Sequence, residues 1–381
     1  MKRHPNLFRK LIDQVDPDAR PGDLVEVRTP QNELLGYGLY NPLAEISVRM
    51  LTWGSRLPDE SFFRERFTQA LALRQELLQL DAVTNAYRVV HAESDGLPGM
   101  VVDRYGDLLS AELFSLAMYQ RSAALLQMLC ELTGAKQWLI QVPAQAHGQE
   151  GFQVAPHGSD GLPESVEIQE HGVRYRVSFS AGHKTGFFCD QRDNRRRLAT
   201  YSAGRDVLDL CCYTGGFSLN AAGPGQAKSV TGVDLDEQAI ALAKENSKRN
   251  GSRINWVHAD AFGYMRDMQR QKRQYDVVVL DPPKLIRSRK EYDDGVRKYL
   301  DFNRLAVGLV KPGGLLLTCS CSGLLPVEEF GSIIRRAAHQ AGESGRRMQI
   351  LERSGAGGDH PVLTDCPETE YLKACWLRVL D

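Results

Sequence analysis

The chain has 381 residues with 25% charged and 42% apolar residues, a formal net charge of -1 and eight cysteines. Its length favours two or three domains, of which we expect three. Its near-neutral charge excludes a polycation, so any nucleic-acid surface must be a local patch. The cysteine spacing is not that of a disulfide scaffold and no apolar run approaches a membrane span, so we expect a soluble cytoplasmic protein with reduced thiols and no metal.

The first 172 residues predict two small domains. Over residues 1–56, short β-like runs such as DLVEVRT and ISVRMLTW alternate with turn signals, which indicates a small β-barrel. Residues 58–80 carry apolar side chains at helical spacing and predict a linking helix. The region 57–172 then predicts an α+β domain, with strands at YRVVHAE, MVVDRYG, LLSAELF and QWLIQV and a helix over 117–132. The Gly-, Pro- and His-rich residues 144–164 predict an exposed loop.

In the region 173–381, the pattern of apolar residues changes at about residue 205, where apolar strands begin to alternate with helices. The expected strands are DVLDLC, SVTGVDLD, INWVHAD, YDVVVLD, GLLLTCS and YLKACWLRVL. This alternation is typical of a doubly wound α/β domain with a mostly parallel sheet. Ligands of such sheets bind at the carboxyl ends of the strands, so the residues that follow each strand are the candidates for function.

The first candidate is the turn in VLDLCCYTGGFSLN, between a buried strand and a helix that carries Phe217. Gly215 and Gly216 lack Cβ atoms and can let the backbone approach a ligand, while Asp209 can reach a cationic amino group. The spacing is not GxGxxG, which disfavours a dinucleotide. A glycine turn can also be purely structural, so this signal is weak on its own.

The next two strands supply acidic groups at the same edge. Asp234 lies 25 residues after Asp209, where a carboxylate can bind a ribose diol, and Asp236 is expected to cap the following helix. Asp260 is placed to accept an adenine amino group beside Ala261 and Phe262, although Phe262 could equally be core. These linked signals predict a nucleoside-containing cofactor.

The fourth strand ends in DPPK, which predicts the reacting site. Pro282 and Pro283 present carbonyls without N-H donors, so a planar base with amino groups can lie against them and Asp281. The loop after them, which begins at Lys284, is basic and could either contact phosphates or be a solvated face.

The fifth strand ends in TCSCSG, with Cys319 and Cys321 at alternate positions on one face. A lone cysteine is more often a small buried apolar group, but the position opposite DPPK favours a nucleophile. Methylation of cytosine at C5 requires a thiolate that adds at C6, because the ring carbon is otherwise a poor nucleophile. At this point either cysteine could serve.

Several motifs together resemble the PUA-domain-containing large-subunit rRNA methyltransferases that make 5-methylcytosine. They are RHPNLF, GYGLYNP, ESDGLPGMVVDRYGD, KTGFFCDQRDNR, DLCCYTGGF, GVDLD, DPPK, SCSG, DHPVL and PETEYLK. The resemblance implies a PUA RNA-binding barrel, a central α+β domain and a class I, Rossmann-like methyltransferase domain with a mixed seven-stranded sheet. It implies S-adenosylmethionine as cofactor, 23S rRNA as substrate and a homodimer. Relatives usually carry a further basic strand before RHPNLF, so the barrel is expected to lack its first strand.

The resemblance also assigns residues. It implies Cys321 rather than Cys319 as the nucleophile, with Asp281 orienting the base. The cofactor is expected to contact Gln191, Asn194, Asp209, Tyr213, Gly215, Phe217, Asp234, Leu235, Asp260, Ala261 and Asp281. The RNA is expected to contact Lys184, Arg192, Pro282, Pro283 and Lys284.

Two other functions remain open from the sequence. DPPK is similar to the D/NPP motifs of amino-group methyltransferases, so a purine could be methylated without a cysteine. Alternatively the chain could be a non-catalytic RNA-binding protein, in which the glycine turn only packs against the sheet.

Overall fold

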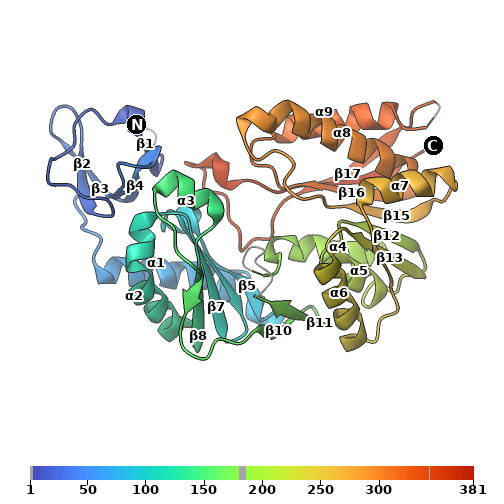
Figure 1. Cartoon of the computed structure of the whole chain (residues 1–381), viewed down its shortest axis with the longest axis horizontal. Coiled ribbons are helices and arrows are strands. Elements are labelled where there is room, and N and C mark those ends of the chain that lie inside the picture. Colours follow the sequence, from blue (N-terminus) through green and yellow to red (C-terminus); the bar gives the residue numbers. More distant parts are fainter. Residues whose placement is uncertain (1–2, 180–185, 343) are drawn as a thin grey trace. The chain divides into compact units, whose positions relative to one another are not determined.

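The computed structural model describes residues 3–179, 186–342 and 344–381 (Figure 1). The chain forms two compact units. The first comprises Met1–Glu170, Val177–Cys189 and Gly358–Thr369, and the second comprises His171–Arg176, Asp190–Gly357 and Glu370–Asp381. Among the described residues, no helix has the length and apolar character needed to cross a membrane.

The first unit begins with an antiparallel sheet, as the alternation of short runs and turns predicts. Its strands are β1 (Asn6–Phe8), β2 (Leu24–Arg28), β3 (Leu34–Tyr40) and β4 (Ile46–Trp53), in the order β1-β4-β3-β2. Tyr40, Val48 and Met50 form its small buried core. The predicted linking helix is α1 (Glu60–Ala72), which begins where the Asp59 side chain accepts the Phe62 N-H and continues as a π-helical turn over Leu73–Leu77.

A five-stranded sheet follows in the same unit and confirms the strands predicted there. It contains β5 (Ala86–His91), β6 (Met100–Tyr105), β7 (Leu108–Leu113), β8 (Gln137–Gln141) and β9 (His157–Gly158), in chain order. Helix α2 (Leu116–Thr133) connects the parallel pair β7 and β8. Figure 1 shows α1 and α2 against this sheet, where Phe67, Met118 and Leu126 belong to one buried cluster.

The prediction of an exposed loop over residues 144–164 is wrong at its start, because Ala144–Glu150 form helix α3. Tertiary contacts of the Glu150 side chain stabilise this helix. The Glu150 carboxylate is buried and accepts from Arg49 Nη2 at 2.6 Å, Asn41 Nδ2 at 3.0 Å and the Leu116 N-H at 3.1 Å. These contacts outweigh the poor helix propensity of a segment that contains Gly148.

The second unit is built on a mixed seven-stranded sheet in the order β14-β13-β12-β15-β16-β18-β17, which confirms the predicted architecture. Its strands are β12 (Asp206–Leu210), β13 (Ser229–Asp234), β14 (Asn255–His258), β15 (Tyr275–Leu280), β16 (Val310–Ser320), β17 (Met348–Ser354) and β18 (Lys373–Val379). Only β18 breaks the parallel run, since it pairs antiparallel with both β16 and β17.

Helices cover both faces of this sheet. Figure 1 shows α4 (Arg192–Thr200), α5 (Gly216–Ala222) and α6 (Glu237–Arg249) on one face and α7 (Ala261–Arg270), α8 (Tyr292–Gly308) and α9 (Val327–His339) on the other. The chain also contains β10 (Ser165–Glu170), β11 (Val173–Ser178) and 3-10 turns at Arg9–Leu11, Leu80–Ala82, Ala92–Asp95, Cys189–Gln191, Arg289–Glu291 and Pro367–Thr369. The carboxyl ends of β12, β13, β15 and β16 share one edge, where the candidate residues were predicted.

Candidate functional site

Asp209 lies near the end of β12 and is fully buried. Its Oδ2 accepts hydrogen bonds from the Ser218 N-H at 2.9 Å and the Ser218 hydroxyl at 2.7 Å, which ties the strand to α5. Its Oδ1 is buried and has no hydrogen-bond partner among the described residues. A buried oxygen without a donor is costly unless a ligand supplies one, so this atom fits the predicted role of receiving a cationic amino group.

The protonation of Asp209 follows from the same burial. Desolvation raises the pKa of this carboxyl to about 7, and the nearby charges of Asp281 and Asp234 act in the same direction, while the Ser218 bonds oppose it. A bound cation would favour the ionised form and offset this desolvation.

The turn after β12 is held in a conformation that few residues adopt. Cys211, Tyr213 and Gly215 have φ angles of 60°, 49° and 88°. At Gly215 a Cβ would lie 2.5 Å from the Trp256 ring, and at Gly232 a Cβ would lie 2.3 Å from the same ring. Trp256 therefore fills the space on the Cβ side of Gly215, and the approach of a ligand to the Gly215 backbone stays a prediction. This glycine is required for packing and for its positive φ.

The acidic residues after β13 and β14 hold the loops around this turn. Asp234 accepts the Tyr213 N-H at 2.7 Å and the Asp236 N-H at 2.9 Å, so it fixes the glycine turn as well as its own loop. Asp236 caps α6 through the N-H groups of Gln238 and Ala239, as predicted. Asp260 caps α7 through the Gly263 N-H, a role that the sequence had not indicated.

The apolar residues predicted to contact the cofactor differ in exposure. Leu235 is 67% exposed beside Asp234, which leaves an apolar surface open at the edge of the sheet. Ala261 is buried, and Phe217 packs in the core cluster with Val207 and Val277. Phe217 therefore has a clear packing role, and its cofactor contact stays a prediction.

The structure brings Gln191, Asn194 and Asp281 together, although 90 residues separate Gln191 from Asp281. Gln191 Nε2 donates to Asp281 Oδ2 at 3.0 Å, and Asn194 Nδ2 donates to Gln191 Oε1 at 2.7 Å. Ser354 at the end of β17 donates to Asn194 Oδ1 at 2.7 Å. This chain of amides orients the Asp281 carboxylate at the end of β15.

The two cysteines of β16 have different surroundings. Leu280 pairs with Thr318 across β15 and β16, so both cysteines lie close to the level of Asp281. Cys319 is fully buried, and burial, followed by the Asp281 charge, raises the pKa of its thiol well above the usual value. Cys321 follows the last residue of β16 and is only partly buried. Of the two, Cys321 has the accessibility that a nucleophile needs.

A polar network that no local sequence pattern indicates supports the segment around Cys321. The Tyr299 hydroxyl from α8 bonds to both Ser320 and Ser322 at 2.9 Å, and Ser322 Oγ also accepts the Ile286 N-H from the loop after DPPK. Lys373, opposite Ser320 on β18, donates to the Ser322 carbonyl at 2.6 Å and to the Tyr371 carbonyl at 2.9 Å. Burial lowers the pKa of Lys373 to about 8.

The residues predicted to contact RNA differ in their exposure to solvent. Pro283 and Lys284 are exposed and Pro282 is buried. Arg192 is almost fully buried, with Nε 3.5 Å from the Asp193 carboxylate, so its guanidinium is not presented to solvent as a cleft residue would be. Lys184 lies outside the described residues.

Comparisons with known proteins agree with this geometry. Residues 95–339 match the family model of S-adenosylmethionine-dependent methyltransferases, and residues 1–53 match that of the PUA-like domain. The chain is similar to ribosomal RNA large subunit methyltransferase I of Pseudoalteromonas atlantica, at 36% identity, and of Klebsiella pneumoniae, at 35%; each alignment covers all of this chain and 96% or 95% of the relative.

Two solved structures share the fold. One is a putative methyltransferase complexed with SAH, with a TM-score of 0.85 and 21% identity over 99% of this chain and 96% of that one. The other is a putative SAM-dependent methyltransferase from Streptococcus mutans, with a TM-score of 0.82 and 20% identity over 98% and 95%.

Proposed function

Because the chain belongs to the ribosomal RNA large subunit methyltransferase I family, we propose that it methylates C5 of a cytosine in 23S rRNA. It is an S-adenosylmethionine-dependent methyltransferase with an N-terminal PUA-like domain. The observation that carries the proposal is the difference between the two cysteines at the carboxyl end of β16. Cys321 is accessible beyond the strand end near Asp281, while the neighbouring Cys319 is sealed in the core.

S-adenosylmethionine, when bound, supplies an electrophilic methyl group on a sulfonium. We infer that three acids at the sheet edge hold it: Asp209 through Oδ1, which has no hydrogen-bond partner among the described residues, Asp234 through the ribose and Asp260 through the adenine amino group. The exposed Leu235 offers apolar surface beside them. The cationic sulfonium and amino group match this acidic edge, which disfavours a non-catalytic role.

The protein's own part in the reaction begins at Cys321. Its thiolate adds to C6 of the cytosine, and the electron pair of the C5-C6 double bond makes C5 nucleophilic. C5 takes the methyl group, a base removes the C5 proton, and the thiolate leaves as the ring double bond reforms. Asp281, oriented by Gln191, can accept a hydrogen bond from the cytosine amino group and hold the ring in place.

We expect the exposed Lys284 and the PUA-like domain to contribute RNA contacts. The basic and acidic side chains of the first 56 residues nearly balance, so shape rather than net charge must guide binding there. We also propose that the protein acts in the cytoplasm and forms a homodimer. Light scattering of the purified chain tests the dimer.

Substitution of the two cysteines tests the mechanism. Cys321→Ala should lower methyl transfer to 23S rRNA by at least about 1,000-fold, because the covalent step is lost, while binding of S-adenosylmethionine persists. Cys319→Ala, the matched control, should keep most of the activity. Full activity in Cys321→Ala would disprove the covalent mechanism, and mass mapping of the nucleoside would then show whether a purine is the true acceptor.

A further inference from the structure

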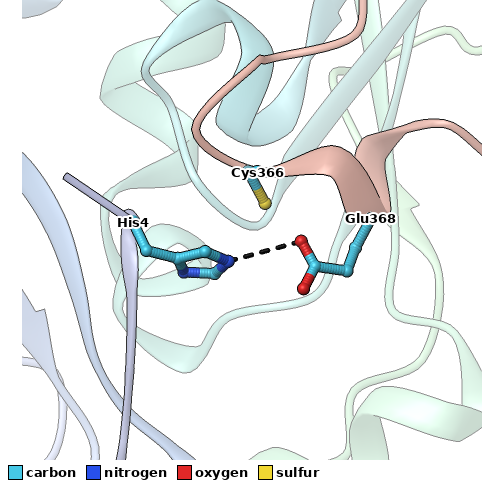
Figure 2. Close-up of side chains that lie close together, drawn as sticks. All are labelled: His4, Cys366 and Glu368. Carbon is cyan, nitrogen blue, oxygen red and sulfur yellow. Dashed lines mark hydrogen bonds and ion pairs between the residues drawn. The ribbon is translucent and has the colours of Figure 1, made fainter. Parts of the chain in front are cut away.

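Three potential metal ligands from distant parts of the chain meet in the first unit. His4 precedes β1, while Cys366 and Glu368 lie in the Gly358–Thr369 segment. Figure 2 shows the three side chains pointing toward one another. Their ligand atoms all lie within 4.8 Å of one another, and His4 Nε2 is 3.3 Å from Glu368 Oε2.

The backbone of Asn6 orients the His4 ring. His4 Nδ1 lies 3.1 Å from the Asn6 carbonyl oxygen and also 3.1 Å from the Asn6 nitrogen, whose N-H donates to it. A histidine ligand is typically oriented in this way through its second ring nitrogen, while the other nitrogen binds the metal. Here that other nitrogen is Nε2, which faces Cys366 and bonds to the Glu368 carboxylate in the metal-free protein.

Cys366 is held by a tight turn. Its N-H donates to the Leu363 carbonyl at 2.9 Å, and its own carbonyl accepts from the Thr369 N-H at 3.0 Å and from the Thr369 hydroxyl at 2.7 Å. The thiol is buried. The turn therefore fixes the thiol beside the His4 ring and the Glu368 carboxylate.

We propose that His4, Cys366 and Glu368 bind one zinc ion. A thiolate, an imidazole and a carboxylate are the ligand types that Zn²⁺ prefers, and three protein ligands leave a fourth tetrahedral position for water. Zinc bonds of about 2.0–2.3 Å require ligand atoms roughly 3.3–3.8 Å apart. The present spacing needs only a small closure, which Glu368 can supply because its side chain is 69% exposed.

Binding exchanges a proton for the metal. The Cys366 thiol releases its proton to solvent as the sulfur-zinc bond forms. The Nε2 proton of His4 moves through solvent to Nδ1, and the hydrogen bond between Nε2 and Glu368 is replaced by one bond from each residue to the ion. The bound ion would join the start of the chain to a segment more than 350 residues later. This departs from the expectation of no metal, because that distance in sequence hides the site from any spacing motif.

Cobalt provides the direct test. The full-length chain is freed of metal with EDTA, kept reduced without added thiols and titrated with Co²⁺. We expect one equivalent to bind with a thiolate-to-cobalt absorption band, and Zn²⁺ to remove that band by displacement. The band should vanish in Cys366→Ser and persist in Cys130→Ser, which changes another buried cysteine of the same unit.

Two further variants guard against a folding defect in Cys366→Ser, which circular dichroism would reveal. Glu368→Gln and His4→Ala change more exposed side chains and should weaken Co²⁺ binding at least about tenfold. The proposal is wrong if the parent chain shows no thiolate band, if the band survives in Cys366→Ser, or if both other variants bind Co²⁺ as tightly as the parent. Methyl transfer plays no part in these measurements, so they stand apart from the proposed function.

Discussion

A single buried carboxyl, Asp209, gives cofactor binding a pH dependence. Its pKa of about 7 in the ligand-free protein means that about half of the molecules carry a neutral Asp209 near pH 7. A cationic amino group binds the ionised form more tightly, so affinity for S-adenosylmethionine should fall below pH 7, by up to about tenfold per pH unit. Calorimetric titration between pH 5.5 and 8.5 measures this slope.

Asp209→Asn provides the control, because an amide keeps the shape without titrating. Its affinity should be lower at pH 8 and nearly independent of pH, and a parent profile equally flat would exclude Asp209 as the titrating group.

The contribution of Asp209 to folding stability depends on pH in the opposite direction. Since the folded pKa lies above the unfolded value of 3.8, the stabilising contribution is complete below pH 3.8 and is lost as pH rises through about 7.

At the scale of elements, the glycine turn between β12 and α5 leaves room for the Trp256 ring to pack against it. Gly215→Ala adds a Cβ that would lie 2.5 Å from the Trp256 ring, at a φ of 88°. We expect a loss of about 2–4 kcal/mol in the free energy of unfolding, together with weaker cofactor binding as the turn shifts.

Gly251→Ala separates the two causes of that loss. Gly251 also has a positive φ, of 61°, but a Cβ there would meet nothing within 4 Å. Gly251→Ala should therefore lower the free energy of unfolding only through backbone strain, by about 1 kcal/mol. Urea unfolding of both variants gives the difference, and equal losses would show that Trp256 is irrelevant.

The sequence predicts well those elements that form because of the pattern of apolar residues within their own segment. The strands β12, β13, β15 and β16 each contain a buried apolar stretch, and a residue of the candidate site lies within one residue of the carboxyl end of each: Asp209, Asp234, Asp281 and Cys321. Strand β17 was missed because it is an edge strand whose apolar residues Ile350 and Leu351 are exposed, so it lacks the long apolar run of a buried strand.

Other features depend on contacts that no local pattern contains. Helix α3 exists because Glu150 meets Arg49, about 100 residues away, and Arg192 is buried although its surroundings in sequence are strongly basic. The link between Gln191 and Asp281 is likewise a product of the fold. The sequence indicated that these two belong near one site, but not that the amide orients the carboxylate.

On the scale of the whole molecule, the chain passes repeatedly between its two compact units. The segment Gly358–Thr369 belongs to the first unit, where the Asp359 carbonyl accepts from the fully buried Arg74 at 2.7 Å and its carboxylate accepts the Arg88 N-H at 3.0 Å. A cut at the predicted boundary after residue 172 would remove these acceptors. Each buried donor left without one costs about 1–3 kcal/mol, and a charged donor costs more.

We therefore expect the fragment 1–172 to unfold at a midpoint at least about 10 °C below that of the first unit in the intact chain, or to aggregate. Differential scanning calorimetry of the fragment and of the full chain measures this. Asp359→Ala in the full chain removes the carboxylate contacts to Arg88 and His360 but keeps the carbonyl bond to Arg74, so it should produce a smaller loss. A fragment as stable as the intact unit would show that Gly358–Thr369 is an accessory strap, and that the N-terminal and central regions fold without any help from the end of the chain.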